Sequence, residues 1–139
     1  MDNEHRDFYN NLFDETGVSN DGYHRGLFYL LGLLPDTRRH IKDLYDAKAD
    51  EIRIGGLNKA WQTGGSIRVT RLAFNLFGGF NGFDGKKQME PVSLYTPYEL
   101  LDPSLCEYCL EACRLRFEYL PELERQTVVE DRVEDEWEQ

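Results

Sequence analysis

Three cysteines lie close together near the end of the chain, at Cys106, Cys109 and Cys113. Thiolates bind zinc, but a structural zinc site takes four thiolate or imidazole ligands, and the nearest histidine in the sequence is His40. The spacing instead places the three thiols and Leu110 on one face of a helix, where free cysteine packs as a small hydrophobic residue. We therefore expect a core helix here, with no metal, no cofactor and no disulfide framework.

A polar, glycine-rich stretch leads directly into a helix that the sequence predicts over 66–77. Exposed N–H groups and the dipole at a helix N-terminus favour anions, and two arginines follow on the first turns. The stretch lacks the lysine and the spacing of a P-loop, so the alternative is a tight turn that packs Trp61 on the core. The candidate anion- or nucleotide-binding residues are Thr63, Gly64, Gly65, Ser66, Arg68 and Arg71.

Two histidines have charged neighbours that would suit acid–base chemistry. His24 stands beside Arg25, and His40 follows Arg38 and Arg39. A catalytic histidine often activates a nucleophile, and no serine or cysteine of this chain stands in a recognisable nucleophile motif. Histidines on helices also cap, form hydrogen bonds or pack. The sequence therefore favours a protein that is not an enzyme and has no catalytic residues.

The end of the chain is strongly acidic. Residues 118–139 carry nine carboxylates against two arginines, and apolar residues recur there every four positions, which is typical of one face of a helix. Such a helix can insert its apolar face into a groove of a partner with a basic surface, or it can dock on its own domain, including the basic region at 58–87. The candidate partner-binding residues are Val129, Glu130, Asp131, Val133, Glu134, Asp135, Glu136 and Trp137.

Composition limits the classes of protein to which the chain can belong. It has 139 residues, of which 40% are hydrophobic and 13% aromatic, as expected for one domain with a packed core. The net charge of −10 argues against direct binding of nucleic acid through its phosphates. The longest apolar run, 27–34, is far shorter than the roughly 20 residues of a membrane span. The polar first residues do not resemble a secretory signal, so we expect a cytoplasmic protein with no membrane partner.

Hydrophobic periodicity predicts a mainly α protein. We expect a compact, single-domain bundle of about five to six helices, with room for one short β-hairpin that pairs 52–54 with 92–94. The helical core domain spans 1–119, and 120–139 form an acidic amphipathic helix or tail. The helices are expected at 3–15, 21–34, 36–46, 66–77 and 103–119 and from Pro121 onward, with Asp21 and Ser66 as N-caps and a capping box at Thr96–Glu99.

Six short motifs carry a family resemblance: Tyr23-His24-Arg25 with Phe28-Tyr29, Thr37-Arg38 with His40, Leu44-Tyr45-Asp46, Trp61-Gln62-Thr63, Arg71 to Leu76, and Tyr95-Thr96-Pro97 with Glu99-Leu100. Together they resemble the core pattern of an uncharacterised family of short proteins from Gram-positive bacteria, their phages and mobile elements. The resemblance covers about 5–119, and the acidic end departs from the family's usual shorter end. Because the family has no established activity, the resemblance implies no functional residue.

These observations favour a non-enzymatic interaction protein. The phage association implies an inhibitor of a host defence protein that handles nucleic acid, of the anti-CRISPR or another anti-defence type, for example a nuclease effector bound by charge mimicry. Two alternatives stay open. One is a small-molecule or nucleotide-binding domain that uses the glycine-rich loop, and the other is a homo-oligomeric structural protein with an exchanged tail. The oligomeric state is not determined by the sequence.

Overall fold

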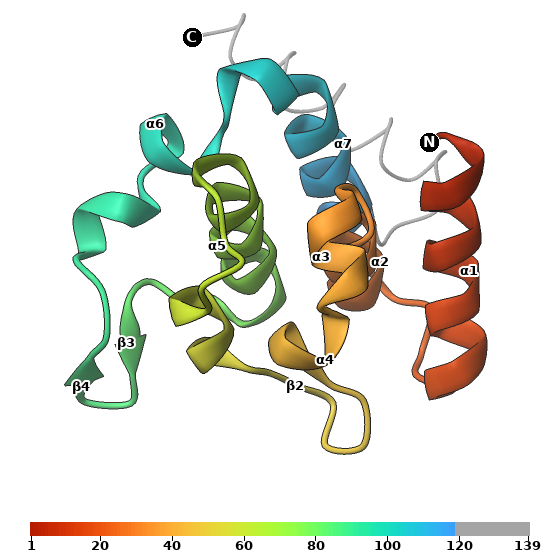
Figure 1. Ribbon diagram of the computed structural model, residues 1–139, viewed down its shortest axis with the longest axis horizontal. Coiled ribbons are helices and arrows are strands. Elements are labelled where there is room, and N and C mark those ends of the chain that lie inside the picture. The colour runs from red at the N-terminus through yellow and green to blue at the C-terminus, as the bar shows by residue number, and fades with distance from the viewer. Residues whose placement is uncertain (119–139) are drawn as a thin grey trace, which may run out of the picture.

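The computed structural model describes residues 1–118, and its architecture is mainly α, as predicted. Two short antiparallel strand pairs accompany the helices, β1 (Tyr45–Asp46) with β2 (Glu51–Ile52) and β3 (Phe83–Asp84) with β4 (Lys87–Gln88). The α-helices of this part of the chain are α1 (Asn3–Thr16), α2 (Gly22–Leu31), α3 (Pro35–Arg39), α4 (Ile41–Leu44), α5 (Gly64–Gly78), α6 (Pro97–Leu100) and α7 (Cys106–Phe117), as Figure 1 shows.

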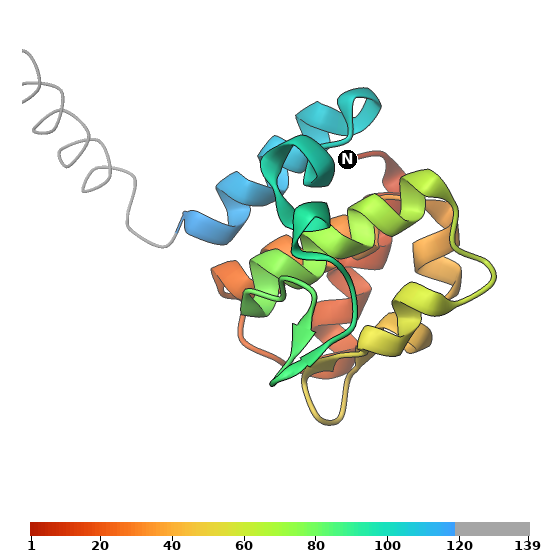
Figure 2. The same ribbon diagram turned by 90° about the vertical axis from the view of Figure 1, so that its left-hand side faces the viewer.

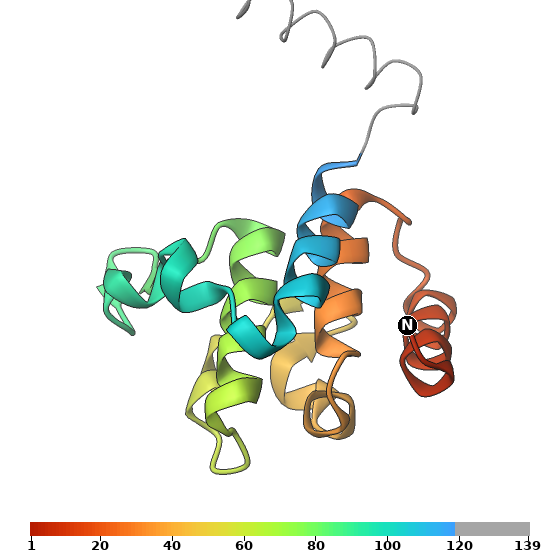
Figure 3. The same cartoon turned by 90° about the horizontal axis from the view of Figure 1, so that it is seen from above.

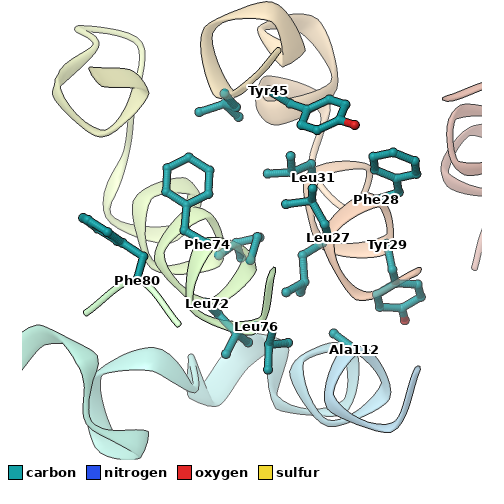
Figure 4. Close-up of a cluster of buried hydrophobic side chains, with 14 of the residues drawn as sticks. Leu27, Phe28, Tyr29, Leu31, Tyr45, Leu72, Phe74, Leu76, Phe80 and Ala112 are labelled. Carbon is teal, nitrogen blue, oxygen red and sulfur yellow. The ribbon is translucent and has the colours of Figure 1, made fainter. Parts of the chain in front are cut away.

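Helix α2 lies at the centre of the fold, packed against α5 on one side and α7 on another, while α1 lies at the edge (Figure 3). Its sequence is apolar on most sides, and Leu27, Phe28, Leu30 and Leu31 are completely buried. Figure 4 shows the side chains of α2 and α5 facing one another in the main cluster of the core. A helix that is apolar almost all round is expected to be central, and α2 has that place.

Several helix ends follow from local sequence signals. The Asp21 side chain accepts a hydrogen bond from the backbone N–H of His24 at the start of α2, as predicted. Gly17 ends α1 in the left-handed conformation, with φ of 66°. The predicted N-cap at Ser66 is wrong. Helix α5 begins at Gly64 because Thr63 is the N-cap, and Thr63 and Ser66 exchange side chain–backbone hydrogen bonds in a capping box.

Other predicted boundaries also need correction. Helix α2 ends at Leu31 because Gly32 is its C-cap, and Leu34 is extended before Pro35, where steric contact with proline disfavours helix. The expected helix over 36–46 is two helices, α3 and α4, separated at His40. The capping box predicted at Thr96 marks the start of α6, but the Thr96 side chain makes no capping hydrogen bond.

The predicted pairing of 52–54 with 92–94 is wrong. Strand β2 pairs with β1, four residues before it in the chain, with Tyr45 opposite Ile52, and Val92–Tyr95 forms a 3₁₀ turn. Pairing across a short loop costs less chain entropy than pairing across forty residues. The stretch after α5 contains the second hairpin, β3–β4.

The last described helix follows the prediction for 103–119 closely. A 3₁₀ turn at Pro103–Leu105, capped by Asp102, leads into α7. Cys109 is completely buried, Cys106 and Cys113 are half-buried, and all three are free thiols. Within residues 1–118, no helix has the length and apolar character needed to cross a membrane. The expected helix from Pro121 and the tail lie outside the described residues.

Candidate binding pocket at the end of helix α5

A pocket of about 470 Å³ lies where α5 ends. Three separate segments form it: the end of the β1–β2 hairpin (50–52), the last residues of α5 with the turn that follows (77–80), and strand β3 (83–84). Figure 1 shows both hairpins in the lower part of the view, and Figure 2 shows β3 below the C-terminal end of α5. A helix or a turn separates each of these segments from the next along the chain.

The electrostatics of this pocket are uniformly negative. Its charged lining residues are Asp50, Glu51 and Asp84, all of them acidic. The C-terminal end of α5 adds backbone carbonyl groups and the negative end of the helix dipole. The apolar walls come from Ile52 and from the phenylalanines of the same segments, of which Phe83 is 38% exposed. This combination suits a positively charged group on an apolar stem, the form of a lysine or arginine side chain.

The turn after α5 fixes the second side of the pocket. Gly79 ends α5 in the left-handed conformation, with φ of 74°, and its N–H donates to the carbonyl of Asn75. The Asn75 amide then donates to the Phe80 carbonyl at 3.0 Å. At Gly82, φ is 104°, and a Cβ atom would lie 2.3 Å from the Glu90 carbonyl oxygen. Only glycine fits there, so the residue before β3 lies in close contact with the segment that follows β4.

Asp50, on the opposite side of the pocket, has an unusual backbone conformation. Its φ of 53° is left-handed, which is costly for a residue other than glycine. Two hydrogen bonds compensate: the Tyr45 hydroxyl donates to Asp50 Oδ1 at 2.6 Å, and His24 Nε2 lies 2.9 Å from the same oxygen. Burial, followed by the hydrogen bond to Asp50, raises the pKa of the Tyr45 phenol. The two partners therefore hold Asp50 at the rim of the pocket.

His24 connects this rim to the start of α2. Its Nδ1 lies 2.8 Å from Asp21 Oδ1, so both ring nitrogens face carboxylates, and the imidazolium form donates to both. Burial alone would raise the pKa of Asp21, but hydrogen bonds from His24 outweigh it and hold that pKa below its usual range. The ring also packs edge-on against Phe77 at 5.4 Å. This histidine is a structural link, because both nitrogens are engaged within the protein.

The predicted anion site lies at the other end of α5, and its side chains already have partners. Thr63 and Ser66 form the capping box, and the Ser66 hydroxyl also donates to Gln62 Oε1 at 2.6 Å. Arg68 donates to the carbonyl of Glu99 at 2.8 Å and to two further carbonyls near it. Gly64 is exposed and Gly65 is half-buried. Anion binding at this end of α5 stays a prediction, and its candidate residues are Thr63, Gly64, Gly65, Ser66, Arg68 and Arg71. Within residues 1–118, the side chains of the threonine, the serine and both arginines are already hydrogen-bonded.

Arg71 is the most tightly held of these side chains. Its Nη2 lies 2.7 Å from Glu90 Oε2, and both side chains are only 14% exposed. The Tyr95 hydroxyl donates to the other Glu90 oxygen. Burial alone would raise the pKa of Glu90, but the hydrogen bonds from Arg71 and Tyr95 hold it below its ordinary value. This triad ties α5 to the segment that follows the β3–β4 hairpin.

The turn before α5 matches the second interpretation of the glycine-rich stretch. Trp61 packs against the core, its indole N–H donates to Asp43 Oδ2 at 3.0 Å, and its ring stacks on His40 with 4.4 Å between centroids. His40 is therefore a packing partner. Among residues 1–118, no group of histidines, cysteines and carboxylates is arranged to hold a metal ion. The predicted partner-binding residues, Val129 to Trp137, lie outside the described residues.

Sequence reasoning did not identify the pocket. His24 was a candidate for its chemistry, but Asp50 and Tyr45, its partners, are 26 and 21 residues away in the chain. The motifs Tyr23-His24-Arg25 and Leu44-Tyr45-Asp46 contain two of the three groups, and that co-occurrence was the only available signal.

Residues 1–128 match a family model that is described as a family of unknown function, DUF6075. The match confirms the predicted membership of an uncharacterised family. No curated protein and no solved structure matches the chain.

Proposed function

The chain belongs to DUF6075, and we propose that it is a non-enzymatic protein that binds a basic segment of another protein in the pocket at the end of α5. The observation that carries the proposal is the lining of this pocket: every charged residue in it is acidic, and the last residues of α5 form part of its wall. A basic side chain inserted there would place its charge among three carboxylates and its carbon stem against the apolar walls.

The size and state of the pocket support this assignment. A volume of about 470 Å³ is in the range of ligand sites, and it holds one long side chain with its backbone. Glu51 and Asp84 pair with Asp46 and Lys87 through the strand backbones, and their side chains make no hydrogen bond or ion pair within residues 1–118. Their charges are therefore available to a partner. Asp50 is already bonded to His24 and Tyr45, so it contributes mainly to the shape of the pocket and to its negative electrostatic potential. Affinity should therefore depend most on Glu51 and Asp84.

The net charge of −10 supports a finer proposal for the partner. A protein that handles nucleic acid presents rows of lysine and arginine, and an acidic protein can occupy them by charge mimicry. We propose a phage- or mobile-element-encoded inhibitor of the anti-CRISPR or another anti-defence type, acting in the cytoplasm on a nuclease effector. It should compete with DNA or RNA for that effector, and a nuclease assay in which excess nucleic acid fails to relieve inhibition would contradict competition.

The pocket is tested with short peptides that carry one central lysine or arginine, titrated into the full chain and followed by NMR. Resonances of 77–84 should shift, and a norleucine peptide should have no such effect. The double variant Glu51→Gln, Asp84→Asn should weaken binding by about tenfold or more, because it removes two charged hydrogen-bond acceptors.

The matched control is Asp14→Asn with Glu107→Gln, which changes the net charge equally at exposed positions on α1 and α7. It should change affinity by less than about twofold, as expected for screened surface charges. Equal losses in both double variants would mean that the peptide responds only to overall charge. That result, or equal binding of the norleucine peptide, would exclude the pocket as the site.

A further inference from the structure

A second pocket, of about 420 Å³, lies between the start of α2 and the end of α7. The two helices approach closely there: a Cβ atom on Gly22 would lie 2.1 Å from the carbonyl oxygen of Arg116. Only glycine permits this contact. The pocket opens beside it, and Asp21, Tyr23, Arg116 and Phe117 complete its lining.

The surface of this second pocket is mainly apolar, and its two charged groups are the Arg116 guanidinium and the Asp21 carboxylate. Asp21 is already bonded to His24, which leaves Arg116 as the charge open to a partner. The Arg116 guanidinium lies 3.7 Å from the centroid of the Tyr23 ring and 4.8 Å from that of Phe117. Its Nε donates to the Leu76 carbonyl at 2.7 Å, which leaves both Nη groups without a hydrogen-bond partner among residues 1–118. Tyr23 is 48% exposed and Phe117 57% exposed. Two large aromatic rings and a cation thus face solvent together, a surface that fits an apolar group with carboxylates beside it.

The sequence after α7 has this chemistry. The C-terminal segment, residues 119–139, contains eight carboxylates, two arginines and Trp137, which stands between Glu136 and Glu138. It also starts at the pocket, because Phe117 lines the pocket and the Glu118 carbonyl accepts a hydrogen bond from Arg25. Trp137 follows Phe117 by only 20 residues, so the two are joined by a short covalent connection. Binding within one chain therefore benefits from an effective concentration of about millimolar.

We propose that this second pocket is the docking site for the chain's own C-terminal segment, with the ring of Trp137 against Tyr23 and Phe117. The neighbouring carboxylates pair with the Arg116 guanidinium. The inference is independent of the proposed function, which uses the pocket at the end of α5. The sequence leaves open whether the acidic end binds a partner or its own domain, and this inference selects binding to its own domain.

The test follows the indole N–H resonance of Trp137 in the full-length protein by NMR, with a synthetic 119–139 peptide as the undocked reference. The chain has only two tryptophans, and Trp61 reports on the fold of the same sample. In the wild type, the Trp137 resonance should lie away from its peptide position and show NOE contacts to the Tyr23 and Phe117 rings. Arg116→Gln or Tyr23→Ser should move it to the peptide position and leave Trp61 unchanged.

Arg116 also bonds to the core, so a third variant changes only the segment: Glu134→Gln, Asp135→Asn, Glu136→Gln. It should likewise shift Trp137 toward the peptide position, whereas the control Tyr98→Ser, on a tyrosine that is 87% exposed, should not. A wild-type Trp137 resonance at the peptide position would overturn the proposal. NOE contacts that appear only between differently labelled chains, and only at high concentration, would assign the pocket to a second copy and overturn docking within one chain.

Discussion

The two ends of α5 show opposite uses of a helix terminus. At the N-terminal end, the groups that could bind an anion are turned inward: Thr63 and Ser66 cap the helix, and Arg68 binds backbone carbonyls. At the C-terminal end, the side chains of Glu51 and Asp84 make no hydrogen bond or ion pair within residues 1–118, and both residues line an open pocket. A helix dipole favours one sign of charge at each end, but it makes a site only where neighbouring side chains are available to a ligand.

The largest expected effect tests whether the N-terminal half of α5 is structural. Arg71→Met should lower the free energy of unfolding by about 3–5 kcal/mol, because it leaves Glu90 buried without its positive partner. Urea denaturation measures the change. Adding Glu90→Gln should restore part of the loss, since the uncompensated charge is then gone. An unchanged stability would mean that Arg71 is available for a ligand, and the contrast between the two ends would fail.

The anion-site prediction offers a second measurement on the same end. A nucleotide or phosphate that bound there at a hundredfold excess over its Kd would stabilise the fold by about 2.7 kcal/mol. We expect no thermal shift from a panel of nucleotides, because the arginine donors are engaged within the protein. A shift that Arg68→Gln abolishes would restore the nucleotide-binding alternative.

Features set by short stretches of sequence were predictable. Asp21 was assigned correctly as the N-cap of α2, because a cap depends on residues within one turn. The apolar pattern of α2 likewise predicted its central place. Thr63 and Ser66 illustrate the limit of such signals. Both residues can cap a helix, and the sequence alone does not say which one lies three residues inside the helix.

The candidate site was not predictable because distant segments form it. Asp50 meets His24 only after α2 and the β1–β2 hairpin pack together, and Phe77 and Asp84 reach the pocket through a helix end and a second hairpin. Hydrophobic periodicity says which face of a helix is buried, but it does not say which turns lie next to one another. Loop 47–50 also has a left-handed Asp50, where a glycine would have marked the turn.

A medium effect tests how the C-terminal end of α5 is shaped. Asp50→Ala should lower the free energy of unfolding by about 2–3 kcal/mol, because His24 and Tyr45 lose their shared partner and alanine is strained at a left-handed φ. Asp50→Gly should recover about 1 kcal/mol of this, since glycine removes only the backbone strain. Urea denaturation of both variants separates the two contributions, and equal losses would mean that the left-handed conformation carries no cost here.

The smallest effect is a pH dependence confined to acid conditions, and it separates the buried carboxylate from those in the pocket. The folded-state pKa of Glu90 lies below its ordinary value of 4.5, so its ion pair contributes stability above that value. The contribution is lost as the pH falls through the folded-state pKa, because the unfolded chain takes up the proton more readily. Glu90→Gln should therefore unfold with a flatter dependence on pH below about 4.5, measured by thermal denaturation at a series of pH values. Glu51→Gln removes an exposed pocket carboxylate and should keep the steep wild-type dependence of stability on pH. If both variants flatten that dependence equally, the ion-paired Glu90 does not differ from the unpaired carboxylates of the pocket.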